Sequence, residues 1–230
     1  MKPTTLLLLT LTPILISAQS NLIGIKAGYS LTGILTASDV FEMQNNYVAG
    51  ISYDFYIVKK ISIDCEILYE ERGADLEVIF TDANGNPTDR YIIPNQHNYI
   101  SFPVKLSYHF GNKFFGFFGA GICPAILLRS EITYPDGYLS HFVDPMPAFS
   151  PTYSKYNFAG LAEIGCGYKL SDRFTGNLSV RYQKSSTAFG GYFDGYHFGT
   201  TVGLGLKYNL DFSCLKDYHG DVLINSSSGF

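Results

Sequence analysis

Hydrophobic and polar residues alternate along most of this 230-residue chain. In the stretch NYISFPVKLSYHFG (98–111), every second residue is Ile, Phe, Val, Leu or Tyr, and this period of two indicates a β-strand. The same period recurs in eight segments, with ends uncertain by about three residues, and no helical period competes with it. These segments are 22–34, 46–58, 61–72, 98–110, 114–128, 157–170, 174–184 and 196–212.

The connections between the predicted strands are alternately long and short. The short ones are 59–60, 111–113 and 171–173, and the long ones are 35–45, 73–97, 129–156 and 185–195. Outer-membrane barrels have this rhythm, with short periplasmic turns and longer outer loops. The sequence therefore predicts an all-β fold, an eight-stranded antiparallel up-and-down transmembrane β-barrel with long extracellular loops, over residues 19–212.

The two faces of the predicted strands differ in composition. One face is rich in Ile, Tyr and Phe, whereas the other carries the charged residues and most of the strand glycines. The interior of an eight-stranded barrel is just wide enough for side chains to fill, so glycines and a few long charged chains fit there and the apolar face must lie outside, in lipid. The alternative is a soluble secreted barrel or sandwich with an apolar core, which would expose the glycine-rich face to water, where glycine weakens a strand.

The chain begins MKPTTLLLLTLTPILISAQS, with a basic residue, an apolar run and a small-residue end at Ser17-Ala18. This pattern predicts a secretory signal peptide over 1–18, since the apolar run is too short for a membrane-spanning helix. We expect export to the outer membrane. Residues 213–230 are expected to form a C-terminal tail outside the barrel.

Composition and charge narrow the classes of function. The chain has 18 Tyr, 18 Phe and 23 Gly, as many short strands would need. Removing Lys2 with the signal leaves 15 basic against 20 acidic residues, a formal charge of −5. Nothing in this balance, and no basic stripe, points to nucleic acid as a partner.

The charged residues on the inner face are predicted to form ion pairs that plug the lumen. The short turn at 171–173 sets Glu163 across from Arg181, and the turn at 59–60 sets Asp54 across from Asp64. Two facing carboxylates need cations, which we expect from the first and fourth strands. The predicted lumen ion-pair residues are Glu163, Arg181, Asp54, Asp64, Glu66, Lys26 and Lys105.

The fourth predicted strand has two irregular features. Pro103 cannot donate a hydrogen bond to a ladder, so it predicts a bulge or a locally missing bond. Lys105 is expected to face Gly119 on the next strand, which would give its side chain room. The cysteines of the barrel are not expected to form a disulfide, because Cys65 and Cys166 lie on the lipid face of strands that are not neighbours and Cys123 points to the lumen.

Four short motifs resemble the PorT-like outer-membrane β-barrel domain family, which has eight-stranded barrels of the OmpA/OmpX type. They are YISFPVKLSYHFG (99–111), FFGAG (117–121), ERGA (71–74) and NFAG (157–160). The resemblance implies a non-enzymatic barrel that acts through its extracellular loops or as an accessory of envelope assembly or protein secretion. The partners would then be outer-membrane lipid and an envelope or secretion protein.

Two long connections are predicted to form extracellular hairpins. LEVIFTDANGNPTDRYII (76–93) turns at Asn84-Gly85, and SEITYPDGYLSHFV (130–143) turns at residues 135–137. Their aromatic residues could form a platform for a ligand or protein; the alternative is an ordered crown without a binding role. The residues of this possible loop surface are Tyr91, Tyr134, Tyr138, His141 and Phe142.

Signals for catalysis or metal binding are weak. The five histidines are scattered singly, and no nucleophile motif of fixed spacing is present. We therefore expect no catalytic residues, no cofactor and no metal site. Two alternatives stay open, an outer-membrane lipid-modifying enzyme and a narrow pore.

Overall fold

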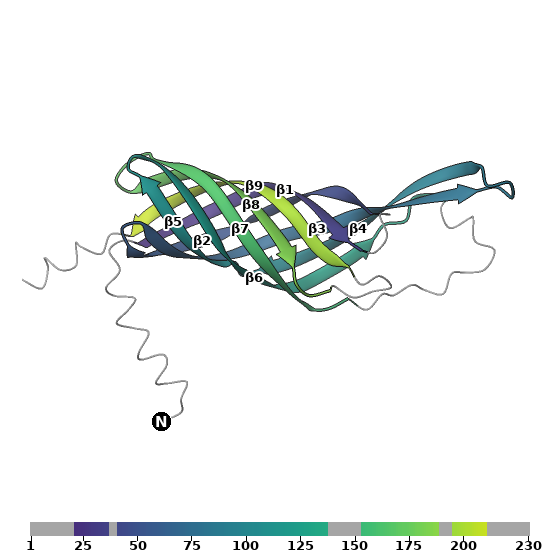
Figure 1. The fold of residues 1–230 in the computed structure, drawn as a ribbon, viewed down its shortest axis with the longest axis horizontal. Helices are drawn as coiled ribbons and strands as arrows, with labels where there is room; N and C mark the ends of the chain where they lie inside the picture. The colour runs from purple at the N-terminus through teal and green to yellow at the C-terminus, as the bar shows by residue number, and fades with distance from the viewer. Residues whose placement is uncertain (1–20, 37–40, 138–152, 189–194, 211–230) are drawn as a thin grey trace, which may run out of the picture.

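The computed structural model describes residues 21–36, 41–137, 153–188 and 195–210, which form nine antiparallel β-strands (Figure 1). None of these residues belongs to a helix long and apolar enough to cross a membrane. The strands are β1 (Asn21–Leu35), β2 (Phe41–Val58), β3 (Ile61–Thr81), β4 (Pro87–Ser101), β5 (Val104–Gly111), β6 (Phe114–Ile132), β7 (Tyr156–Lys169), β8 (Phe174–Ser185) and β9 (Tyr196–Leu210).

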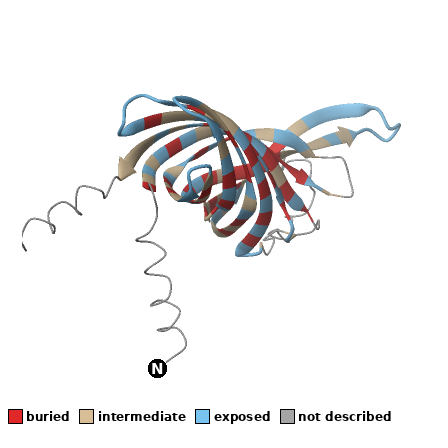
Figure 2. Ribbon diagram, turned by 60° about the vertical axis from the view of Figure 1, so that its left-hand side comes forward, coloured by how far each residue is buried: buried red, intermediate tan, exposed pale blue. Residues whose placement is uncertain are grey.

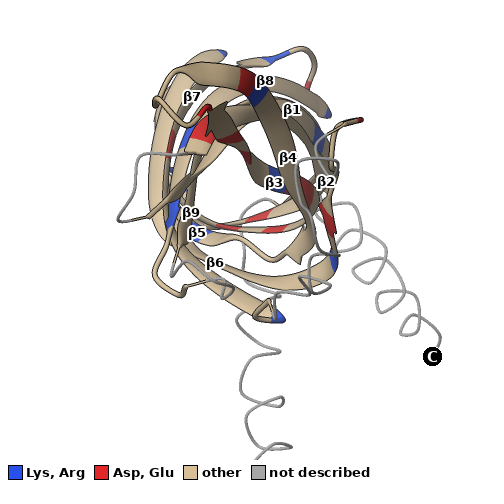
Figure 3. Cartoon of the chain, turned by 90° about the vertical axis from the view of Figure 1, so that its right-hand side faces the viewer, with Lys and Arg blue, Asp and Glu red and all other residues tan. Residues whose placement is uncertain are grey.

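The strands close into a ring of eight positions. β4 and β5 follow one another in the same position, since both pair with β3 on one side and with β6 on the other. β1 pairs with both β2 and β9, which completes the ring. The view along the barrel axis in Figure 3 shows this closed wall. The predicted eight-stranded antiparallel barrel is confirmed.

The break between β4 and β5 falls at Phe102 and Pro103, so the irregularity predicted from the proline is confirmed. The neighbouring strands bridge the break: the Glu66 amide donates to the Pro103 carbonyl at 2.9 Å, and the Phe102 amide donates to the Pro124 carbonyl at 2.8 Å. Because Pro103 has no N–H to donate, the ladder loses a bond there while both neighbouring strands stay attached.

Burial alternates along the strands within the ring, as the red and blue bands of Figure 2 show. The inward side carries most of the buried polar and charged residues, and the outward side carries large apolar residues such as Ile25 and Leu204, which are 63% and 66% exposed. The prediction that the apolar face lies outside is therefore confirmed. Outward aromatic residues gather in two girdles, as in outer-membrane barrels. One girdle, near the short turns, contains Phe110, Phe114, Tyr168 and Phe174; the other, toward the long loops, contains Tyr29, Tyr47, Tyr69, Tyr156 and Tyr182.

The two ends of the barrel differ. All three short turns lie at one end, together with the start of β1 and the end of β9, and the hairpin of β3 and β4 projects beyond the opposite end (Figure 1). Within the long connection 73–97, residues 76–93 form the predicted hairpin, because cross-strand pairs such as Leu76 with Ile93 continue the ladder beyond the ring. The predicted signal peptide and tail lie outside the described residues.

Three cysteines fall within the described chain, and all three are free. Cys65 is exposed on the outer face, and Cys166 is half-buried on the same outward face of β7 as the exposed Ile164 and Tyr168. Cys123 is completely buried in the lumen. Their predicted facing is confirmed, and the barrel wall separates Cys123 from the other two.

Candidate functional site

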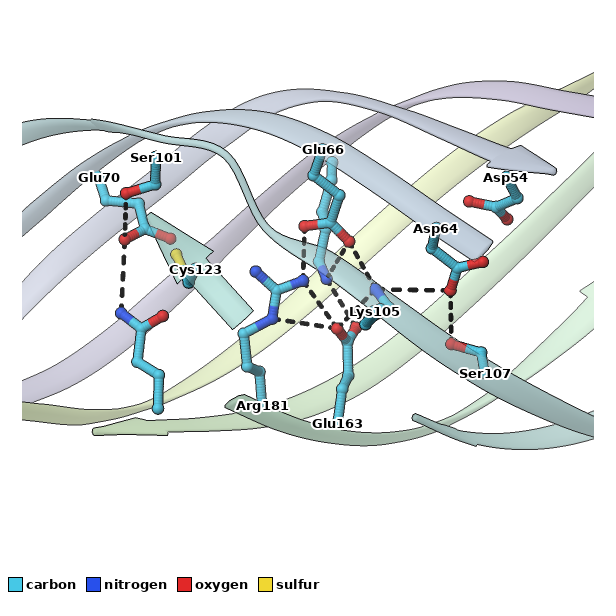
Figure 4. Close-up of polar contacts among 12 residues, drawn as sticks. Asp54, Asp64, Glu66, Glu70, Ser101, Lys105, Ser107, Cys123, Glu163 and Arg181 are labelled. Carbon is cyan, nitrogen blue, oxygen red and sulfur yellow. Dashed lines mark hydrogen bonds and ion pairs between the residues drawn. The ribbon is translucent and has the colours of Figure 1, made fainter. Parts of the chain in front are cut away.

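The middle of the lumen holds a cluster of five charged side chains from five strands, here named the central cluster: Lys26, Glu66, Lys105, Glu163 and Arg181. Figure 4 labels the last four of these residues. Lys26 Nζ donates to Glu163 Oε1 at 2.7 Å, and Lys105 Nζ donates to both carboxylates at 2.6 and 2.8 Å. All five side chains are at most 6% exposed. Charges this deeply buried are tolerated only when they are paired and hydrogen-bonded.

Arg181 connects the two carboxylates of the central cluster. Its Nε and Nη2 donate to Glu163 Oε2 at 3.0 and 2.7 Å, and Nη2 also donates to Glu66 Oε2 at 2.5 Å. Glu163 and Arg181 are direct cross-strand partners on β7 and β8, the pairing expected from the turn between these strands. The planar guanidinium suits this double recognition, because its donors are held in a fixed fork.

The prediction that Gly119 faces Lys105 is wrong. Gly111 has a positive φ of 100° and belongs to the ladder, where it pairs with Phe115. This pairing shifts the register of β5 against β6, so that Lys105 pairs with Gly121. A Cβ added at Gly121 would lie 2.0 Å from the Val104 carbonyl oxygen and 2.8 Å from the Cβ of Lys105. The close approach of β5 to β6 at Lys105 therefore requires glycine at position 121.

A second charged group, here named the short-turn cluster, lies toward the end of the barrel with the short turns. Asp54 and Asp64 are cross-strand partners, as expected. Asp54 is paired with Lys207, and Asp64 lies 3.7 Å from Lys105 and accepts hydrogen bonds from two serines. Lys26 was expected to flank these carboxylates, but it contacts the central cluster instead, because its ladder partner on β2 is Gly50, four residues from Asp54.

Aromatic rings fill the lumen beside the short-turn cluster. Phe115 and Phe117 point inward, and the His109 ring stacks on Phe117 at a centroid distance of 5.7 Å. Glycines on β7 make room for both rings: a Cβ at Gly165 would lie 2.5 Å from Phe117, and one at Gly167 would lie 2.3 Å from Phe115. Sequence reasoning missed these two phenylalanines, although they share the alternation of Gly119 and Gly121 on the same strand.

Toward the long loops, Arg72 and Glu70 form a third buried pair, which we name the outer pair. Arg72 Nε donates to Glu70 Oε2 at 2.9 Å, and its Nη1 donates to Asn157 Oδ1 at 3.0 Å. Glu70 Oε2 also accepts from Ser101 Oγ at 2.9 Å. The Arg72 guanidinium lies over the Tyr99 ring at 4.9 Å. This ion pair is not among those predicted from the sequence, although both residues continue the inward series of Asp64 and Glu66 on β3.

Above the outer pair, aromatic and imidazole rings pack across the barrel. The His97 and His197 rings lie 5.2 Å apart, and Tyr153 lies 4.8 Å from His97. Tyr99 Oη lies 3.4 Å from His197 Nε2. Within the described chain, no group of three or more His, Cys, Asp and Glu side chains is placed to hold a metal ion.

The charges of the described lumen are balanced. The central cluster, the short-turn cluster and the outer pair together contain five basic side chains (Lys26, Arg72, Lys105, Arg181, Lys207) and five acidic ones (Asp54, Asp64, Glu66, Glu70, Glu163). Figure 3 shows both signs of charge on the barrel strands. Two cavities between these side chains each have a volume of about 10 Å³, which is room for about one water molecule. The side chains, and not a water column, fill this part of the barrel.

The hairpin of β3 and β4 is the largest described feature outside the ring. Its tip is held by Asp82, whose side chain accepts hydrogen bonds from the backbone amides of Asn86 and Asn84 at 2.9 and 2.8 Å. These hydrogen bonds, chiefly that from the Asn86 amide, lower the pKa of Asp82 below its ordinary value. Gly85 has a φ of 84°, consistent with the predicted turn at Asn84-Gly85.

Of the predicted loop surface, Tyr91 and Tyr134 are described. Tyr91 pairs with Val78 across the hairpin and packs edge-on against Phe80 at 5.9 Å. Tyr134 follows the end of β6, and a Cβ at nearby Gly137 would lie 3.5 Å from Tyr91 Oη. The segment after β6 therefore approaches the hairpin. Tyr138, His141 and Phe142 lie outside the described residues.

Residues 17–184 match the outer membrane protein β-barrel domain family. Among solved structures, the chain is similar to the outer membrane protein OprG from Pseudomonas aeruginosa, with a TM-score of 0.53 at 11% identity over 84% of this chain and 96% of that chain. It is also similar to Neisserial surface protein A (TM-score 0.45, 9% identity, 81% and 96% covered) and to Ail of Yersinia pestis (TM-score 0.40, 14% identity, 82% and 98% covered). No curated protein sequence gives a significant match. At these identities the likeness to solved structures shows the fold alone.

Proposed function

Because this chain belongs to the outer membrane protein β-barrel domain family, we propose that it is a sealed, non-enzymatic barrel that acts through its extracellular hairpin as an accessory of envelope assembly or protein secretion. The protein is located in the outer membrane. In such barrels the short turns face the periplasm and the longer connections face outward. The β3–β4 hairpin is therefore extracellular.

The main support for the proposal is that side chains fill the lumen of the barrel whereas the β3–β4 hairpin projects beyond it. The five basic and five acidic lumen side chains are paired with one another, with cavities of about 10 Å³ between them. A barrel filled in this way leaves its outer surface and its extracellular segments for contact with other molecules. The PorT-like motifs at 99–111 and 117–121 favour an envelope or secretion protein as the partner.

The lumen also contains a serine and histidine in contact, which bears on the enzymatic alternative. Ser62 Oγ lies 2.9 Å from His109 Nε2. In a catalytic triad the carboxylate orients the histidine, but here Asp64 accepts its hydrogen bond from Ser62, at 2.5 Å, and His109 Nδ1 has no partner in the described chain. This arrangement supports a structural role for the contact.

The hairpin exposes apolar residues above the outer girdle. Ile79 and Ile92 are 53% and 47% exposed on the outward side of the hairpin. Arg90 lies beside them and pairs with Glu77 at 2.5 Å. Apolar side chains rimmed by charges, outside the membrane, are typical of protein interaction surfaces.

The test is capture of an envelope protein by the hairpin. Residues 77–92 are replaced by an Asn-Gly turn between Leu76 and Ile93, which are cross-strand partners, so that the ladder below is kept. The complete chain and the variant with the shortened hairpin are each cross-linked in intact cells and purified in mild detergent. We expect an envelope or secretion protein with the complete chain and its loss with the shortened hairpin. Equal capture by both proteins, or capture by neither, would contradict the proposal, provided that both show the heat-dependent gel mobility of a folded barrel.

A further inference from the structure

An apolar hollow of about 690 Å³ lies on the lipid-facing wall formed by β5, β6, β7 and β8. Its floor contains Ala120 and Ala162, which are cross-strand partners on β6 and β7. Leu106 and Tyr182 continue the same cross-strand row on either side, so two small residues lie between two large ones. The hollow therefore has the shape of a groove in a wall of otherwise bulky side chains.

On the extracellular side of the alanine pair, beyond the residues that line the hollow, the wall carries a glycine. Gly160 lies two residues from Ala162 on the same face of β7, and a Cβ added there would meet no atom within 4 Å. The ladder partner of Gly160 is Lys184, which is exposed on β8 and forms no ion pair with any described residue. Lys184 follows Tyr182 of the outer girdle, which puts its ammonium at the height of lipid headgroups.

The opposite wall supplies a matched comparison. There Leu204, Ala27, Ala49 and Tyr69 form a cross-strand row with the same order of residue types. Above these alanines, however, Tyr29 and Tyr47 pack edge-on at 5.7 Å. Both walls contain an alanine pair. On the β5–β8 wall an open glycine and a lysine lie above it, whereas on the opposite wall two packed tyrosine rings do.

We propose that the hollow on β5–β8 binds one acyl chain of an anionic membrane lipid, whose phosphate carries the headgroup's uncompensated negative charge and pairs with Lys184. The protein is located in the outer membrane, so lipid covers this wall, and an unfilled apolar hollow would lose dispersion contacts that a flexible acyl chain restores. A basic residue near the membrane surface attracts an anionic headgroup. This site is separate from the extracellular hairpin, and it does not depend on the proposed function.

The absence of tryptophan from the sequence allows a direct test. Phe118→Trp puts a single fluorophore on the wall of the hollow, and the protein is reconstituted in bilayers that contain brominated phosphatidylglycerol or brominated phosphatidylcholine, which quench tryptophan on contact. We expect phosphatidylglycerol to reach half-maximal quenching at a mole fraction about fivefold lower than phosphatidylcholine, the preference given by one lysine at the membrane surface. Ile164→Trp on the same wall is the second reporter if the first variant does not fold.

The control reporter is Ile25→Trp, which lies two residues before Ala27, as Phe118 lies two residues before Ala120. Lys184→Gln should abolish the preference at Phe118→Trp, and Ala162→Leu should weaken quenching there, whereas Ala49→Leu on the opposite wall should leave it unchanged. Equal quenching by the two lipids at Phe118→Trp, the same preference at Ile25→Trp, or a preference that survives Lys184→Gln would overturn the proposal.

Discussion

Glu163 and Arg181 face each other across the ladder of β7 and β8, and two nitrogens of the guanidinium donate to one oxygen of the carboxylate at 3.0 and 2.7 Å. The same arginine reaches Glu66 on the far side of the lumen. The pair thus ties adjacent strands together and also links opposite walls of the barrel. Removing either residue would leave a buried charge without its partner.

Arg181→Ala should lower the free energy of unfolding by about 3 to 5 kcal/mol, the usual result of breaking a buried ion pair. The lumen charges are balanced, so the double change with Glu163→Ala restores the balance and should be less destabilising than the sum of the two single changes by about 1 kcal/mol or more. Urea unfolding in detergent micelles measures both quantities.

The control for this cycle combines Glu163→Ala with Arg90→Ala on the distant, exposed hairpin, where the effects should add within about 0.5 kcal/mol. If Arg181→Ala unfolds no more easily than the wild-type protein, the central cluster does not hold the barrel together.

Arg72→Lys should be destabilising although it keeps the charge. Arg72 donates from three nitrogens to Glu70, Asn157 and Ser101, and a lysine ammonium cannot reproduce that planar set of donors. We expect a loss of about 1 to 3 kcal/mol in the free energy of unfolding. Arg90→Lys, at an ion pair that is largely exposed, should change it by less than about 0.5 kcal/mol. Equal effects of the two substitutions would count against a structural role for the outer pair.

Gly121→Ala should disturb the lumen at Lys105. The added methyl group would lie 2.0 Å from the Val104 carbonyl oxygen, so β5 and β6 must shift, which we expect to reduce stability by about 1 to 3 kcal/mol. Gly160→Ala, which points to open space on the lipid side, should change stability by less than about 0.5 kcal/mol. Heating samples of the two variants to a series of temperatures before electrophoresis compares the temperatures at which they lose the mobility of a folded barrel. A tolerated Gly121→Ala would mean that β5 and β6 are further apart than described.

The hairpin tip should loosen in acid. The pKa of Asp82 is lowered in the folded hairpin by hydrogen bonds from Asn86 and Asn84. Their contribution is complete above the ordinary carboxyl pKa and is lost as the pH falls through the lowered value. A carboxyl ¹³C titration by NMR should give a midpoint below that of an unstructured aspartate, and Asn86→Ala should move the midpoint upward. A midpoint at or above the ordinary carboxyl pKa that Asn86→Ala does not change would contradict the role of these hydrogen bonds.

Cross-strand residue pairs that depend only on the alternation of side chains and on the length of a turn could be predicted from the sequence. Glu163 with Arg181 follows from a short turn with a regular ladder, and Asp54 with Asp64 holds although the register shifts between Tyr56 and Val58 beside the turn. The partner of Lys105 did not follow, because the positive φ of Gly111 shifts the ladder and no residue pattern announces that shift.

Side-chain contacts between strands on opposite sides of the lumen could not be predicted from the sequence either. Which carboxylate Lys26 reaches depends on the stagger of the strands around the ring and on the length of its side chain, not on its immediate neighbours. The outer pair was missed for another reason. The alternation predicts that the third strand ends at Arg72, within the motif ERGA, whereas β3 continues to Thr81 and carries the inward alternation of side chains past it.

The most direct test of the central claim, a barrel sealed by its own side chains, is the conductance of the purified wild-type protein in a planar lipid bilayer. Paired charges and aromatic rings fill the described lumen from the short-turn cluster to the histidine pair. We therefore expect folded protein, verified by its heat-dependent gel mobility, to insert without steady current at moderate voltage. Steady, ohmic channels whose conductance rises with salt concentration would contradict the sealed barrel and favour the narrow pore.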